Sequence, residues 1–157
     1  MLIVADSSAL IALAVCDGLD ILLHVYDDVR VPQAVYDEVA MQEKPEAATL
    51  EAFLVGRVVD VDTTRMVLAA GGLGQGEIEA MALYKQLSAD ALLIDDHRAR
   101  TIAEHNHIKC IGALGTLLLA KENGQIEKVA PYVQKFRLSS IHYGDALLDK
   151  VLKLAGE

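Results

Sequence analysis

The sequence contains no tryptophan, and aromatic residues make up only 4% of its 157 residues, against 53% hydrophobic residues in all. An apolar interior built so largely from aliphatic side chains is typical of a parallel β-sheet buried on both faces. Cysteine is scarce as well. Cys16 and Cys110 stand alone in no spacing that would bind a metal, and they fit buried thiols in a reducing cytoplasm.

Long hydrophobic runs are also missing. No stretch reaches the roughly 18 consecutive apolar residues that a membrane-spanning helix requires. The apolar opening, MLIVADSSALIALAV, is interrupted by Asp6 and has no basic segment before it, so we do not expect a secretory signal. The length predicts a single domain over residues 1–157 with a sizeable core. We therefore expect a cytoplasmic protein.

Basic residues are outnumbered, with 14 Lys and Arg against 23 Asp and Glu and a formal net charge of −9. This balance argues against a protein that binds nucleic acid through a broad basic face.

Short aliphatic runs alternate with helix-length amphipathic stretches along the chain. We expect strands at 2–6, 29–31, 56–62, 91–95 and 108–112, and helices at 7–15, 18–25, 32–42, 45–55, 75–88, 97–105, 113–122, 125–137 and 143–155. Pro32 is expected at the first position of its helix. In the last helix, an apolar stripe is expected to pack onto the core or a second subunit; it consists of Ala146, Leu147, Val151 and Leu154. The alternation predicts a three-layer α/β/α fold with a central parallel sheet of about five strands.

The segment GGLGQGE, residues 71–77, invites comparison with a glycine-rich nucleotide loop. The dinucleotide fingerprint G-x-G-x-x-G fails in register, because Glu77 or Glu79 stands where the third glycine belongs. The Walker pattern also fails, since Gly76 is followed by Glu77 and Ile78. A carboxylate at this place would repel a phosphate. The glycines instead indicate a sharp turn into a helix whose first turn contains Glu77.

Acidic residues directly follow two of the predicted strands: Asp6 ends LIVAD, and Asp95 and Asp96 end ALLIDD. In parallel α/β sheets, ligands bind beyond the carboxyl ends of the strands, at the point where the strand order reverses. One such aspartate could equally be a helix N-cap. Two strands with the same ending favour a shared site.

Helix phase adds two glutamates to this set. Glu38 lies beside the buried stripe around Val35, whereas Asp37 points more outward. Glu77 continues the apolar stripe of its own helix, and Glu79 lies roughly 200° around from it. We expect Glu38 and Glu77 to face the centre that the aspartates define.

Four motifs, in this order, resemble those of the PIN domain, the metal-dependent nuclease fold of VapC-type toxins. ADSSALIAL is similar to the strand-Asp-[Ser/Thr]-[Ser/Asn] opening, and VPQAVYDEV to the second motif, which carries over to Glu38. LGQGEIEAMAL resembles the third, with Glu77 where many relatives have Asp. LLIDDHRAR resembles the fourth, where relatives often read Thr-x-Asp; spacing favours Asp96 and strand-end position favours Asp95. The likeness covers nearly the whole chain and is nearest to a branch with a glycine-Glu helix start and a double aspartate.

This resemblance implies endonucleolytic cleavage of single-stranded RNA with Mg²⁺ or Mn²⁺. Converging carboxylates repel one another without a cation, and these hard ions take oxygen ligands. The resemblance implies that Asp6 and either Asp95 or Asp96 are the primary metal ligands. It implies that Glu38 and Glu77 bind a second ion, directly or through water. Ser8 would orient a metal-bound water, and Arg98 and Arg100 would contact phosphate. Ser8 fits a helix-start hydroxyl as well, and both arginines fit ordinary exposed helix charges. His97 is a candidate for lining the site. The expected partners are a small protein antitoxin and a second copy of the chain.

Three alternatives share part of the pattern. A haloacid-type phosphatase needs Asp-x-Asp at its first strand, where this chain has Ser8 two residues beyond Asp6. A receiver-like module needs a lysine at its fifth strand, which here ends in Cys110, Ile111 and Gly112. The third is a degenerate PIN domain that only binds a partner, against which the complete set of acids argues.

Overall fold

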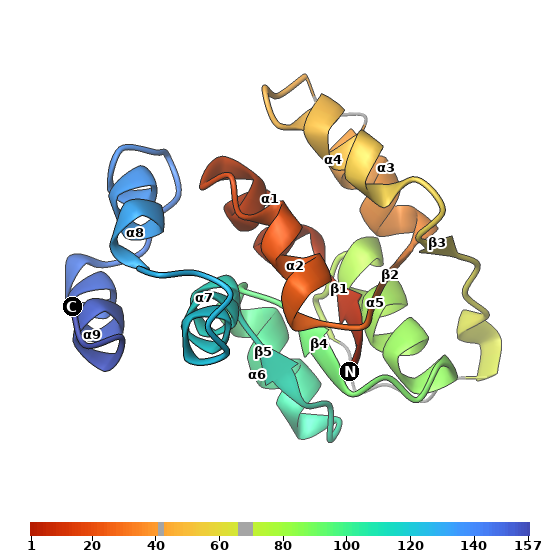
Figure 1. Cartoon of the computed structure of the whole chain (residues 1–157). Helices are drawn as coiled ribbons and strands as arrows, with labels where there is room; N and C mark the ends of the chain where they lie inside the picture. The colour runs from red at the N-terminus through yellow and green to blue at the C-terminus, as the bar shows by residue number, and fades with distance from the viewer. Residues whose placement is uncertain (41–42, 66–70) are drawn as a thin grey trace.

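The computed structural model describes residues 1–40, 43–65 and 71–157 of the chain (Figure 1). Its elements are β1 (Leu2–Ala5), α1 (Ser7–Val15), α2 (Leu19–Val25), β2 (Asp28–Pro32), α3 (Gln33–Ala40), α4 (Ala47–Leu54), β3 (Val58–Val59), the 3₁₀ turn η1 (Thr63–Arg65), α5 (Gln75–Gln86), β4 (Ala91–Leu93), α6 (His97–His105), β5 (Cys110–Ile111), α7 (Ala113–Glu122), α8 (Ala130–Arg137) and α9 (Asp145–Leu154).

The five strands form one parallel sheet in the order β3-β2-β1-β4-β5. β1 is central, with Ile3 opposite Val29 of β2 on one side and Ala91 of β4 on the other. The chain leaves β1 in one direction to β2 and β3, then crosses back to β4 and β5. The strand order therefore reverses between β1 and β4, which is where such sheets bind ligands.

Helices cover both faces of the sheet, as predicted. Right-handed connections place the helices between β1 and β3 on one face and α5 and α6, which lead to β4 and β5, on the other. α5 contacts β1, β2 and β4, and α7, after β5, packs against α1 and α2. α3, which follows the carboxyl end of β2, also contacts α5, and α8 and α9 lie together beside α7, away from α3 and α4 (Figure 1). The three-layer α/β/α fold with five parallel strands is confirmed.

The core is aliphatic, as the composition indicated. Ile3, Val4, Leu92 and Leu93 of the two central strands are fully buried. Within the described residues no single helix is long and apolar enough to cross a membrane. α1 and α2 would be long and apolar enough only together, and this pair is bent by 112°. Five residues of α1 and three of α2 belong to this buried core.

Several predicted boundaries are wrong. Pro32 ends β2 and does not open a helix, because its missing N–H is tolerated at the end of a strand. The predicted third strand shrinks to two residues, and the predicted helix 125–137 begins only at Ala130. Residues 41 and 42, where a helix was predicted to end, lie outside the described residues.

The predicted stripe of the last helix meets the core only in part. Val151 is buried together with Leu148, whereas Leu147 and Leu154 are 45% and 65% exposed, so packing of the whole stripe onto the core is wrong and packing onto a second subunit stays a prediction. The helix packs against α7 and α8 with this neighbouring face, so helical spacing alone did not identify the side that is covered.

Candidate functional site

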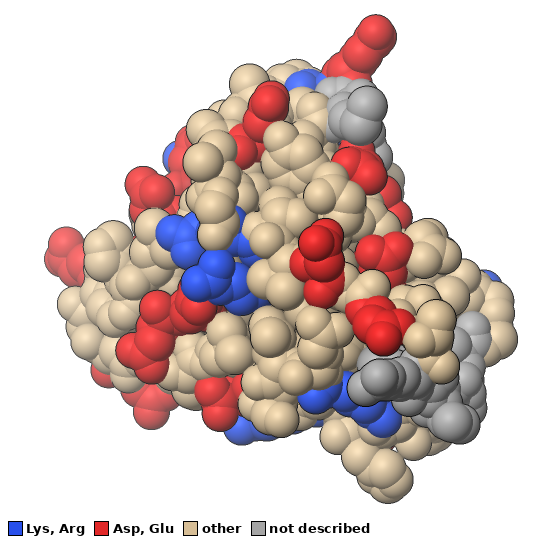
Figure 2. Space-filling model, turned by 90° about the vertical axis from the view of Figure 1, so that its right-hand side faces the viewer, with Lys and Arg blue, Asp and Glu red and all other residues tan. Residues whose placement is uncertain are grey.

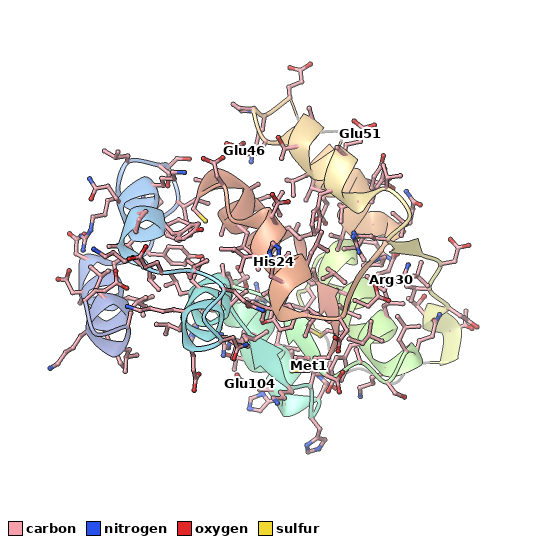
Figure 3. All side chains as sticks on the ribbon, viewed as in Figure 1. Met1, His24, Arg30, Glu46, Glu51 and Glu104 are labelled. Atoms are coloured by element: carbon pink, nitrogen blue, oxygen red, sulfur yellow. The ribbon has the colours of Figure 1, made fainter. Side chains whose placement is uncertain are left out.

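The carboxyl end of β1 places Asp6 at the reversal of strand order, at the opposite end of the strand from Met1 (Figure 3). Asp6 is the N-cap of α1 and only 2% exposed. Its Oδ2 accepts hydrogen bonds from the backbone N–H and the hydroxyl of Ser8, the latter at 2.8 Å. Within the part of the chain that the structure describes, Oδ1 is buried without a hydrogen-bond partner. One oxygen therefore caps the helix and the other is left over.

Burial above all, with a smaller contribution from the charge of Glu77, raises the pKa of Asp6 to about 6, against the opposing effect of the hydrogen bonds from Ser8. An ionised carboxylate here loses hydration without gaining a counter-charge. A cation at Oδ1 would supply that charge.

Ser8 joins the ends of the two central strands. Its hydroxyl donates to Asp6 and accepts the backbone N–H groups of Asp95 at 3.0 Å and Asp96 at 3.3 Å. The hydroxyl thus fixes the turn after β4 against the turn after β1. The role expected from the family resemblance, orienting a water, is not needed to explain this serine.

Glu38 approaches from α3. Its Oε2 accepts a hydrogen bond of 2.7 Å from the hydroxyl of Ser7, the first residue of α1. Asp37, one residue earlier, bonds Gln33 on its own helix. The helix phase inferred from the sequence therefore brings Glu38, and not Asp37, to the end of β1.

Glu77 lies at the start of α5, where its Oε2 accepts the N–H of Gly74 at 2.9 Å. The start of α5 meets Glu38, because a Cβ atom on Gly76 would lie 2.9 Å from Cδ of Glu38, and the charge of Glu77 contributes to the raised pKa of Asp6. Glu79 bonds Gln75 within the same helix. Asp6, Glu38 and Glu77 thus occupy one neighbourhood, supplied by β1, α3 and α5.

The glycines of the segment 71–77 allow charged side chains to approach the backbone closely. A Cβ atom on Gly76 would lie 2.5 Å from Oε1 of Glu38, so glycine is what lets α5 meet this carboxylate. Gly72 stands against the guanidinium of Arg98. Two of the glycines therefore border charged side chains of the site, and the segment positions Glu77 as its sequence indicated.

The two aspartates after β4 differ in their surroundings. Oδ1 of Asp95 accepts the N–H of Ala113 at 3.0 Å, and Oδ2 accepts the hydroxyl of Tyr143 at 2.5 Å. Burial raises the pKa of Asp95, while these bonds oppose the shift. Asp96 is exposed and caps α6 through the N–H of Ala99 at 2.8 Å. Asp95 is therefore held within the protein, and Asp96 faces outward.

The sequence did not predict Tyr143 as a site residue, because an isolated tyrosine in the segment before α9 belongs to no motif or periodic pattern. Its ring packs edge-on against Phe136 of α8, with centroids 4.9 Å apart. Together with Asp95 it links the C-terminal helices to the end of β4.

The two arginines diverge. Arg98 lies at the glycine segment, and Arg100 points toward Asp95 and forms an exposed pair with Glu104 at 3.2 Å. Figure 2 shows one face on which acidic side chains are scattered and basic ones gather in small groups. This face offers no broad basic surface, in keeping with the net charge.

The donor set fits a hard divalent ion. The described residues contain no preassembled group of three or more His, Cys, Asp or Glu in metal-binding geometry. Mg²⁺, however, often keeps several waters and takes only one or two protein carboxylates. The unpartnered oxygen of Asp6 is such a ligand, and Glu38 and Glu77 are oxygen donors beside it.

A doubly wound parallel sheet with acidic residues at the ends of its two central strands places this protein among α/β proteins with a polar site at the reversal of strand order. The chain matches the family model described as DUF3368, PIN domain, over residues 2–157, and it belongs to the PIN domain family. PIN domains are usually nucleases and generally use Mg²⁺ or Mn²⁺. Membership sets aside the phosphatase and receiver alternatives. Comparison with curated proteins and with solved structures gives no match.

Proposed function

We propose that this protein is a metal-dependent endoribonuclease that cleaves single-stranded RNA, and that it is the toxin of a VapC-type toxin-antitoxin pair. The observation that carries the proposal is the buried, unpartnered Oδ1 of Asp6 at the reversal of strand order. A buried carboxylate oxygen without a donor is costly. It is accounted for if a Mg²⁺ or Mn²⁺ ion binds there.

In this proposal Asp6 and Asp96 are the primary acids, and Glu38 and Glu77 complete the set. Asp95 holds Tyr143 and the start of α7, and so positions the neighbouring residues. Ser8 keeps Asp6 and Asp96 at a fixed separation by bonding both strand ends. When bound, the ion would polarise the phosphodiester and stabilise the leaving oxygen.

The resemblance to VapC-type toxins supports the finer parts of the proposal: a single PIN-like domain over residues 1–157, cytoplasmic location, a small inhibitory antitoxin and a homodimer. Expression without an antitoxin should then arrest growth, and Asp6→Asn should relieve the arrest. Equal toxicity of the two proteins would contradict the toxin role.

Cleavage of an unstructured RNA oligonucleotide tests the enzymatic part. With Mg²⁺ or Mn²⁺ the wild-type chain should cut the RNA, and Asp6→Asn should lose at least about a hundredfold in rate, as expected when one preorganised charge is removed. Circular dichroism should show that the variant is folded. A wild-type protein that cuts no RNA with either ion would favour the alternative of a PIN domain that only binds a partner.

Matched pairs assign the glutamates. Glu77→Gln keeps an acceptor for the N–H of Gly74 but removes the charge, so cleavage should fall about tenfold to a thousandfold while the fold stays intact. Glu79→Gln should change it little. Likewise, Glu38→Gln should cost more than Asp37→Asn. If Glu79 and Asp37 prove the sensitive pair, the assignment of the acids is wrong.

A further inference from the structure

A pocket of about 570 Å³ opens beside the proposed site, between the end of β4, the start of α6, β5 and the segment that leads into α9. Asp95, His97 and Arg100 line it from β4 and α6, and His142 and Leu147 line it from α9 and the segment before it. Its size is within the roughly 300–1,000 Å³ typical of small-molecule sites.

The pocket adjoins the proposed site through one residue, Asp95. The backbone N–H of Asp95 bonds the hydroxyl of Ser8 at 3.0 Å, and this hydroxyl bonds Asp6 at 2.8 Å. The side chain of Asp95 lines the pocket. An extended chain bound at Asp6 would therefore reach the pocket within a short distance.

The pocket differs in charge from the rest of this acidic protein. Its described lining contains one arginine, two histidines and a single acid, Asp95. Both oxygens of that acid already accept hydrogen bonds, from Ala113 and Tyr143. Arg100 and the two histidines add N–H donors to the pocket. The exposed pair of Arg100 with Glu104 is weak enough to exchange for a phosphate.

Apolar side chains form the other part of the lining. Leu114 and Ile111 border the pocket, and Leu147, 45% exposed, stands at its edge. A guanidinium binds phosphate well, and apolar side chains pack against the face of a base. A pocket that offers both is suited to a nucleotide.

We propose that this pocket binds one nucleotide of single-stranded RNA next to the phosphate at Asp6, with Arg100 on its phosphate and Leu147 and Leu114 against its base. The inference rests on the proposed function, and it adds a site that binds the RNA beside the carboxylates that would cleave it.

Fluorescence anisotropy with a labelled single-stranded oligoribonucleotide tests this by binding alone. The measurement uses the full chain with Asp6→Asn in buffer without divalent ions, so that neither cleavage nor the charge of Asp6 interferes. Arg100→Gln in this background should weaken Kd about tenfold and lower the slope of log K against log salt by about 0.7. Leu147→Glu, which puts a negative charge at the pocket edge, should weaken Kd by at least about tenfold.

Arg30→Gln is the matched control, because it makes the same change in net charge on β2, where Arg30 pairs with Asp28 and which β1 separates from β4. It should alter Kd less than about twofold. If the Asp6→Asn chain binds no RNA, or if Arg100→Gln and Leu147→Glu bind like Arg30→Gln, the inference is overturned, the second result pointing to a protein occupant such as an antitoxin. The proposed function fails separately, if the wild-type protein with metal cuts no RNA.

Discussion

At the scale of single residues, the two carboxylate oxygens of Asp6 have different surroundings. Oδ2 of Asp6 caps α1 through Ser8, and Oδ1 has no partner among the described residues. A structural and a functional explanation of this aspartate are therefore compatible, because they concern different atoms. Asp96 likewise caps α6 through Oδ1 while it is exposed.

Asp6→Asn should stabilise the metal-free protein in a pH-dependent way. The folded pKa of about 6 lies above the ordinary value of 3.8, so the folded state holds the proton more tightly than the unfolded chain. This contribution to stability is complete below about pH 4 and is lost as the pH rises through 6. Asparagine does not ionise, so the variant should gain about 2 kcal/mol relative to wild type between pH 4.5 and 7.5.

Urea unfolding in EDTA at the two pH values measures this difference. Asp37→Asn is the control, because its carboxylate is exposed and bonds Gln33 on the surface of α3. Its effect should be nearly the same at both pH values. A gain for Asp6→Asn that does not grow with pH would contradict the proposed cost of the buried charge.

The sequence predicted which acids stand at the strand ends, because an aspartate after four apolar strand residues lies at the edge of the core whatever follows. It did not show which oxygens remain available. That depends on Tyr143, which is 48 residues from Asp95, and on the N–H of Ala113 at the start of another helix. Such partners are set by tertiary packing.

At the scale of elements, the helix ends were predicted correctly where the hydrophobic periodicity of the segment sets them, and wrongly where a contact from a distant part of the chain sets them. α1 and α6 begin and end as predicted. α8 begins at Ala130, where the side chain of Glu157 accepts the N–H groups of Val129 and Ala130, and Lys121 pairs with the same carboxylate at 2.8 Å. No local pattern indicates a helix start capped from 27 residues away.

Gly76 tests how α5 meets α3. Alanine favours a helix over glycine by up to about 1 kcal/mol, yet its Cβ would lie 2.5 Å from Oε1 of Glu38. That oxygen is at the end of a flexible side chain, so Gly76→Ala should move Glu38 off Ser7 and leave the fold stable. Cleavage should therefore drop about as far as in Glu38→Gln, with Tm nearly unchanged.

Gly71→Ala is the control, since among the described residues no atom beyond its chain neighbours lies within 4 Å of an added Cβ, and its activity should stay at the wild-type level. The double variant Gly76→Ala, Glu38→Gln should be no slower than the slower single variant, because both changes remove one contribution. Additive losses would show that Gly76 acts on something other than Glu38.

At the scale of the whole molecule, the acidic composition and a nucleic-acid substrate are compatible if charge is arranged locally. The net charge of −9 forbids binding through a wide basic surface. In the proposed function, the carboxylates around Asp6 would attract a cation, and Arg100 of the neighbouring pocket would contact phosphate. Specific contacts at one end of the sheet then replace a general electrostatic attraction, and the affinity for RNA should depend only weakly on salt.

Metal binding should be visible in the stability of the whole chain. An ion that binds only the folded state raises the unfolding free energy by about 2.7 kcal/mol at a hundred times its Kd, which for a protein of this size corresponds to about 5–10 °C in Tm. Differential scanning fluorimetry with Mg²⁺ or Mn²⁺, against NaCl of equal ionic strength, measures the shift. In Asp6→Asn most of this rise in Tm should be lost, because the side chain no longer offers a negatively charged oxygen to the ion. Glu79→Gln should keep the rise in Tm. An equal rise in wild type and Asp6→Asn would mean that the ions only screen the charge of an acidic protein, and the metal site at Asp6 would then be wrong.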